Sequence, residues 1–241
     1  DSPPLLILVG GLRVADAGYR AITKLENERR VIVPTYPPLK TMAALTDGIV
    51  GLLDKLTIEK VDVLSGSFGG LVAQGLVQRH GQTVRKLILS STGLMTESTI
   101  TERKKTLRLL RLMPNRLVQR FTERRLFTII NPPVSAHSFW RAYLRELFSQ
   151  RLAKPDILST IRCMINFGEN IQRTSHDPLL WDGDVLIIGS EDDHTFGQGG
   201  QHHLLTLFPT ADVFTYSNAG HSPSITQSDD YFHRIREFLN T

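Results

Sequence analysis

Short apolar runs alternate along this chain with segments in which apolar residues recur every three or four positions. The runs predict buried strands of a parallel sheet, because such strands are covered on both faces, and the periodic segments predict helices. Strands are expected at residues 5–9, 30–34, 61–64, 86–90, 184–188 and 211–216, and helices around them at 15–25, 42–56, 71–77 and 229–239. This alternation predicts an α/β fold, with a mostly parallel sheet and helices on both of its faces.

The strand pattern stops between residues 96 and 178. Four helices separated by prolines are expected in this part of the chain, at residues 101–113, 115–130, 135–150 and 155–167. Because strands return after residue 178, we expect residues 1–95 and 179–241 to form one core. Residues 96–178 would then form a helical insertion in that core.

Composition agrees with a soluble globular protein. The chain has 241 residues, of which 41% are hydrophobic and 22% charged, and no apolar run is long enough to predict a transmembrane segment. The only cysteine, Cys163, excludes an internal disulfide and favours a reducing, cytoplasmic location. The chain starts at Asp1 rather than at methionine, which is compatible with removal of a leader or of an N-terminal hairpin. Targeting is therefore not judged from this end.

Charge is distributed unevenly. The net charge is +4, yet residues 95–170 hold 14 Lys and Arg against 6 Asp and Glu. Helical spacing predicts two basic faces there, one formed by Lys104, Arg108 and Arg111 and the other by Arg116, Arg120 and Arg124. Solvated helix faces are the simpler interpretation, and weak contact with an anionic surface or an acyl-CoA is the alternative. Nucleic-acid binding is not expected, because the basic residues lack interleaved aromatic side chains.

The junction at residues 65–69, Ser-Gly-Ser-Phe-Gly, carries the strongest chemical signal. Small residues let a strand turn sharply into a helix, and a serine at the apex is exposed and strained, as in the pattern G-x-S-x-G. Ser67 is then the candidate nucleophile, with Ser65 at the first small position and Gly69 at the last. Ser65 is not the candidate nucleophile, because Val63 would then stand at the small-residue position two residues before it. An ordinary tight turn is the alternative, and the missing G-K-[ST] ending argues against a phosphate-binding loop.

A serine nucleophile needs a base whose pKa lies near neutral pH, which makes histidine the natural partner. Among eight histidines, His221 lies in a loop that leaves the last strand at its carboxyl end, where it can meet Ser67. Surface or structural roles are expected for His80, His137, His176 and His233.

The histidine in turn needs a carboxylate to orient it. The loop after the strand at 184–188 offers three adjacent ones, Glu191, Asp192 and Asp193. Such a cluster could also be a solvated loop. A metal site would need these carboxylates together with His194 and His202 or His203. That arrangement lacks a recognised ligand spacing, so neither a metal nor a cofactor is expected.

Acyl transfer also requires two N–H donors for the negative oxygen of the tetrahedral intermediate. Phe68 follows the nucleophile directly, and Leu12 lies in the loop after the first strand, where Gly11 lets the backbone approach closely. We expect the N–H groups of Phe68 and Leu12 to form this oxyanion hole, although the glycines could mark only a tight turn.

Together these motifs resemble the α/β-hydrolase superfamily over nearly the whole chain. The elbow at 65–70 looks like that of esterases and carbon–carbon bond hydrolases, and residues 219–223, Ala-Gly-His-Ser-Pro, match the closing segment of the family. Residues 185–193 resemble its strand followed by Gly-Glu-Asp-Asp. Aligned on the strand, the triad acid is Asp193, which we prefer; aligned on Gly189, it is Asp192.

Several positions depart from the family pattern. Gly10 stands where many members have histidine before the oxyanion-loop glycine, and Ser65 and Ser190 stand in glycine positions. Residues 35–38 read Thr-Tyr-Pro-Pro instead of Asp-x-Pro-Gly, and the chain begins at what resembles the third strand of the family.

The resemblance implies a cofactor-independent serine hydrolase in which residues 96–178 form a lid over the pocket. We expect cleavage of a small to medium, largely apolar carboxylic ester or thioester, carried out by Ser67, Asp193 and His221. One alternative is a hydrolase of carbon–carbon bonds in diketone-like substrates, which would use the same triad. The other is a catalytically weak member that serves as a receptor or interaction module.

Overall fold

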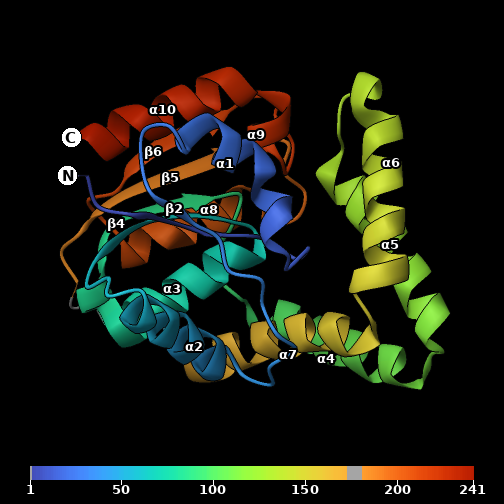
Figure 1. Ribbon diagram of the computed structural model, residues 1–241. Helices are drawn as coiled ribbons and strands as arrows, with labels where there is room; N and C mark the ends of the chain where they lie inside the picture. Colours follow the sequence, from blue (N-terminus) through green and yellow to red (C-terminus); the bar gives the residue numbers. More distant parts are fainter. Residues whose placement is uncertain (1, 173–180) are drawn as a thin grey trace.

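The structure is a computed structural model that describes residues 2–172 and 181–241 (Figure 1). Six strands form one parallel sheet in the order β2-β1-β3-β4-β5-β6. Their bounds are β1 Leu5–Leu8, β2 Val31–Ile32, β3 Val61–Gly66, β4 Val84–Ser90, β5 Asp184–Ser190 and β6 Asp212–Tyr216. The expected α/β class and parallel sheet are confirmed.

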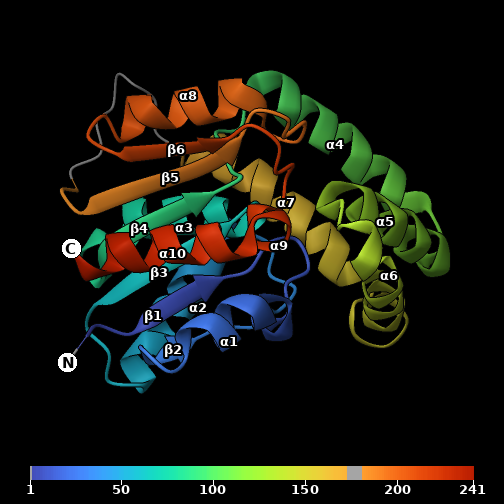
Figure 2. The same cartoon turned by 90° about the horizontal axis from the view of Figure 1, so that it is seen from above.

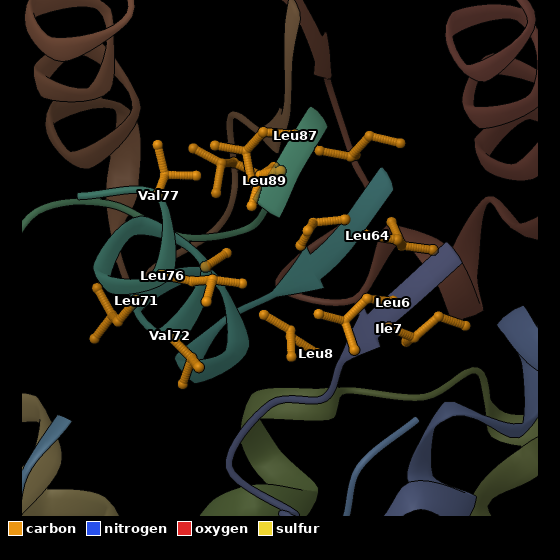
Figure 3. Close-up of a cluster of buried hydrophobic side chains, with 14 of the residues drawn as sticks. Leu6, Ile7, Leu8, Leu64, Leu71, Val72, Leu76, Val77, Leu87 and Leu89 are labelled. Carbon is orange, nitrogen blue, oxygen red and sulfur yellow. The ribbon is translucent and has the colours of Figure 1, made fainter. Parts of the chain in front are cut away.

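Helices cover both faces of this sheet. Figure 1 shows α1 (Tyr19–Leu25) and α10 (Ser228–Asn240) on one face and α2 (Met42–Lys55) and α3 (Phe68–His80) on the other. Apolar residues of β1, β3 and β4 form the main core on both sides of the sheet: Leu8 and Leu89 lie on the side of α3, and Ile7 and Leu64 on the opposite side (Figure 3). Because these three strands are buried on both faces, they read in the sequence as mostly apolar runs, interrupted by Asp62 in β3 and by Arg85 and Lys86 in β4.

The helical insertion lies between β4 and β5. It contains α4 (Glu97–Leu112), α5 (Asn115–Ile130), α6 (His137–Glu146) and α7 (Lys154–Asn170), with one π-helical turn at Leu147–Arg151. Figure 2 shows α5 and α6 beyond one end of the strands. A second hydrophobic cluster, which includes Leu107, Val118 and Trp140, holds these helices together. The expected end of the insertion at residue 178, and His176, lie outside the described residues.

Several elements differ from the sequence expectation. The short helix α9 (Pro223–Thr226) was not expected, and β2 covers only Val31–Ile32 of the expected 30–34. Helix α8 (Gly197–Leu207), between β5 and β6, was not expected, because its first turn contains several glycines, which lower helix propensity. Helix α4 begins four residues earlier than expected, because the hydroxyl of Thr96 accepts a hydrogen bond from the N–H of Thr99, 3.2 Å away, and caps it.

The two basic faces predicted on α4 and α5 lie at the surface. Lys104 forms an ion pair with Glu169, while the side chains of the other five members, Arg108, Arg111, Arg116, Arg120 and Arg124, are exposed. Across the described ranges, every helix is too short or too polar to cross a membrane.

Candidate active site

Ser67 lies at the turn between β3 and α3, in a strained backbone conformation. Its φ of 53° and ψ of −122° are unusual for a residue with a side chain. Two hydrogen bonds hold the turn: the N–H of Ser67 donates to the carbonyl oxygen of Ser90, and the Thr92 hydroxyl donates to that of Ser67, each at 3.0 Å. The surrounding structure therefore imposes the conformation expected of an exposed nucleophile.

Close packing explains the small residues around Ser67. A Cβ atom on Gly69 would lie 1.9 Å from the carbonyl oxygen of Leu8, so only glycine lets α3 start against β1. Ser65 is buried, and its hydroxyl donates to the carbonyl oxygen of Ile88, 2.7 Å away. The serine at the first small position thus fits without an unsatisfied polar group.

Replacing Gly69 by alanine is expected to destabilise the fold by about 3 kcal/mol or more, because the new methyl group would overlap backbone atoms that cannot move aside. Urea unfolding of the purified variant measures this loss. Gly51→Ala in the middle of α2 is the control, since a Cβ there meets nothing within 4 Å and should stabilise the helix by up to about 1 kcal/mol. Equal unfolding midpoints for the two variants would contradict the expectation.

Three side chains from separate loops form a hydrogen-bonded chain. The Nε2 atom of His221 lies 2.9 Å from the Oγ of Ser67, and its Nδ1 lies 2.8 Å from Oδ2 of Asp193. Because the carboxylate can only accept, Nδ1 carries the hydrogen in the neutral ring and Nε2 is free to take the serine proton. The structure brings together the three residues expected to act.

Asp193 is only 6% exposed, and burial alone would raise its pKa. The hydrogen bond and charge of His221 and the N–H of Thr195, 2.8 Å from Oδ1, outweigh burial and hold that pKa below its ordinary value. Asp193 therefore stays negative at neutral pH, as is required of a carboxylate that is to orient a catalytic histidine.

Asp192, the alternative acid, points elsewhere. Its Oδ1 accepts hydrogen bonds from the Ser190 hydroxyl at 2.5 Å, the N–H of Gly220 at 2.9 Å and the N–H of Ala219 at 3.2 Å. These bonds, with Ser190 first, hold the pKa of Asp192 below its ordinary value despite slight desolvation. Asp192 and Ser190 thus fix the loop that carries His221.

The expected oxyanion donors flank Ser67. Phe68 is the first residue of α3, so its N–H has no carbonyl partner one turn earlier in the helix. The loop after β1 approaches closely, because a Cβ on Gly10 would lie 3.4 Å from the Cβ of Ser67. Gly11 and Leu12 follow in this loop and line a cavity together with Ser67. Donation by the N–H of Leu12 stays a prediction.

Two largely apolar cavities meet at Ser67 and Gly11. The first, of about 200 Å³, is also lined by His221. The second, of about 130 Å³, is also lined by Phe68. Leu126 and Ile129 of α5 line both cavities, so the insertion contributes to the walls beside Ser67.

Sequence reasoning missed three arginines that line the second cavity, Arg13, Arg103 and Arg125. A signal for Arg103 was present: it precedes the buried Leu107 and Leu110 by four and seven positions, so it lies on the apolar side of α4. Arg125 likewise follows the buried Val118 by seven positions.

The other candidate histidines lie away from Ser67. His80 forms an ion pair with Asp47, His137 hydrogen-bonds the carbonyl of Pro132, and His233 pairs with Glu237. In the parts of the chain that the structure describes, no three potential metal ligands cluster. The side chain of His202 lies outside that description.

Comparison with known proteins identifies relatives of this chain by sequence and by fold. A family model described as the alpha/beta hydrolase fold matches residues 34–228. A 2-hydroxymuconate semialdehyde hydrolase from Pseudomonas putida is 24% identical, and the match covers 83% of this chain and 69% of that protein.

Solved structures show the same fold at low sequence identity. The enol-lactonase from Burkholderia xenovorans superposes with a TM-score of 0.79 at 15% identity, covering 100% of this chain and 92% of that chain. A meta-cleavage product hydrolase from Pseudomonas fluorescens gives a TM-score of 0.77 at 19% identity, covering 100% and 91% respectively.

Proposed function

The chain belongs to the α/β-hydrolase family, and from that premise we propose that it is a serine hydrolase that cleaves a carboxylic ester or thioester. The observation that carries the proposal is the hydrogen-bonded chain from Asp193 through His221 to Ser67. It joins a nucleophile, a base and an orienting acid at the floor of two cavities, which is the arrangement that acyl transfer requires.

The first half of the reaction forms an acyl-enzyme. The Oγ of Ser67 attacks the carbonyl carbon while Nε2 of His221 takes the hydroxyl proton. Negative charge moves to the carbonyl oxygen, where the N–H groups of Phe68 and Leu12 stabilise it. His221 then gives its proton to the departing alkoxide or thiolate, and Ser67 remains acylated.

The second half releases the acid. A water molecule gives a proton to His221 and attacks the acyl carbon, and the same N–H groups stabilise the second tetrahedral intermediate. As this intermediate collapses, His221 returns the proton to Ser67. The net reaction adds one water and yields a carboxylic acid and an alcohol or thiol. The modest volumes of the two cavities favour small to medium substrates.

A carbon–carbon bond hydrolase is the second candidate. It is favoured by the similarity to the 2-hydroxymuconate semialdehyde hydrolase, and it would use the same three side chains. Comparing turnover of an ester with turnover of a diketone of matched size separates the two candidates, because the enzyme is expected to favour the ester.

A fluorophosphonate probe tests the hydrolase proposal directly. Such probes react with serines activated by a neighbouring base, so the native protein is expected to gain one adduct, located at Ser67 by fragmentation of the labelled peptide. Heat-denatured protein is the control and should not be labelled. A folded native protein that stays unlabelled would support the receptor alternative and contradict the proposal.

A further inference from the structure

The second cavity beside Ser67 has an unusual charge. Arg13, Arg103 and Arg125 all line it, and none of its other described lining residues is acidic. Among the residues that the structure describes, none of these three arginines forms an ion pair with a carboxylate. Arg151, by contrast, forms an ion pair with Asp16. The cavity therefore concentrates positive charge that the described part of the protein does not neutralise.

Arg13 is the most deeply placed of the three, at 1% exposure. Its terminal nitrogens donate to Thr160 Oγ1 at 2.8 Å and to the carbonyl oxygens of Pro37 at 2.6 Å and Tyr36 at 3.3 Å. All three acceptors are neutral, and its buried Nε has no partner in the described structure. Burial lowers the pKa of Arg13, and the neighbouring carboxylate of Asp156 offsets this only in part. A buried cation whose hydrogen-bond acceptors are all neutral is costly, so an anion in this cavity would be strongly stabilised.

Arg103 of α4 and Arg125 of α5 add two further cations. Burial and the neighbouring guanidinium of Arg125 both lower the pKa of Arg103, and the charge of Glu102 only partly offsets them. Guanidinium groups stay protonated at neutral pH even so. Exposure rises from Arg13 through half-buried Arg103 to exposed Arg125, so the three charges lead from the interior to the surface.

The two cavities can be assigned to the two parts of an ester. His221 must protonate the leaving group, and it lines the first cavity, so the alcohol or thiol departs there. The acyl part then lies in the second cavity, beside Phe68 and the arginines. We propose that this arginine cavity binds a carboxylate at the far end of the acyl chain, so that the preferred substrates are monoesters of short dicarboxylic acids. This inference rests on the proposed hydrolase function.

A carboxylate fits this cavity better than the phosphates of an acyl-CoA. The planar guanidinium fork matches both anions, but a volume of about 130 Å³ admits a short chain and not a nucleotide. Hydrolysis of such a monoester consumes one water molecule and yields the dicarboxylic acid and an alcohol, and no other reactant is needed.

Kinetics with matched substrates test the assignment. Monoethyl adipate carries the negative charge, while its neutral counterpart ethyl 6-amino-6-oxohexanoate has the same length with a terminal amide; acid release is followed in a pH-stat. Wild type is expected to prefer the charged ester by about 10- to 100-fold in kcat/KM, the range of a charged hydrogen bond. Arg103→Gln and Arg125→Gln should each reduce this preference about tenfold, mainly through a higher KM for the charged ester.

Two neighbouring arginines provide matched controls. Arg108 on α4 and Arg124 on α5 are exposed and do not line the cavity, so Arg108→Gln and Arg124→Gln should retain the preference. Equal rates for the charged and neutral esters in wild type would overturn the carboxylate assignment. So would a loss of preference in the control variants equal to that in the cavity variants, or a preference for adipoyl-CoA over monoethyl adipate.

Binding without turnover separates this inference from the proposed function. Calorimetry with the Ser67→Ala protein is expected to show that monoethyl adipate binds, and that Arg103→Gln in the same background weakens binding about tenfold. Charge-dependent binding together with an absence of wild-type hydrolysis would support the arginine cavity and contradict the hydrolase. Hydrolysis of the neutral ester without charge-dependent binding would support the hydrolase and overturn the carboxylate subsite.

Discussion

Ser67→Ala is expected to lower kcat on an activated ester by about 10⁴- to 10⁶-fold while the protein remains folded. The variant removes the atom that attacks the carbonyl carbon and breaks the 2.9 Å link to His221. Residual activity should come only from the oxyanion donors and from substrate positioning. Single-turnover kinetics with a p-nitrophenyl ester measure the loss of rate, and a urea unfolding curve shows that the variant remains folded.

Ser65→Ala is the matched control, because it removes a hydroxyl two residues away in the same turn. The Ser65 hydroxyl donates to the carbonyl oxygen of Ile88 inside the sheet, so its loss should cost about 1 kcal/mol of stability and change kcat by less than about threefold. If Ser65→Ala were as inactive as Ser67→Ala, the effect would belong to the geometry of the turn and not to a nucleophile.

The fold was predictable where one local signal decided the structure. The runs that became β1, β3 and β4 are mostly apolar, because helices cover both faces of the sheet. Helix α8 was not predictable in this way, because its first turn contains several glycines and its stability depends on packing against β5. Tertiary contacts, which the sequence does not display, override weak helix propensity there.

The site shows the same limit at the level of single residues. Ser67 and His221 follow from spacing and chain order, but Asp192 and Asp193 are adjacent in one loop. Which carboxylate faces the histidine depends on how that loop turns. The Ser190 hydroxyl decides this by bonding Asp192 and accepting from the N–H of Ala219 at 2.9 Å. Such a long-range bond leaves no periodic signal in the sequence.

Ser65 and Ser190 stand at positions where the family pattern has glycine, and both have a structural role. Ser65 satisfies a carbonyl of β4, and Ser190 ties the end of β5 to the loop of His221. The hydroxyl group of each serine is hydrogen-bonded within the fold, so neither serine disturbs the geometry of Ser67. The departures from the family pattern do not by themselves argue for an inactive site.

Asp193→Asn is expected to lower kcat at pH 7 by about 10⁴-fold with little change in stability. The amide of asparagine can donate to Nδ1, which would leave the hydrogen of His221 on Nε2, where the ring can no longer take the serine proton. It also removes the charge that stabilises the imidazolium. Steady-state kinetics at pH 7 measure the loss.

Asp192→Asn, one residue away, should behave in the opposite manner. It weakens the bonds that fix Ala219 and Gly220, so we expect a loss of stability and at most about a tenfold loss of kcat.

Because the pKa of Asp192 is lowered in the folded protein, its stabilising contribution is present above the ordinary Asp pKa of about 4 and is lost as pH falls through the folded pKa. The stability gap between wild type and Asp192→Asn should therefore be full at pH 7 and shrink in acid, as urea unfolding at both pH values would show. If Asp192→Asn lost more kcat than Asp193→Asn, the acid of the triad would have to be reassigned to Asp192.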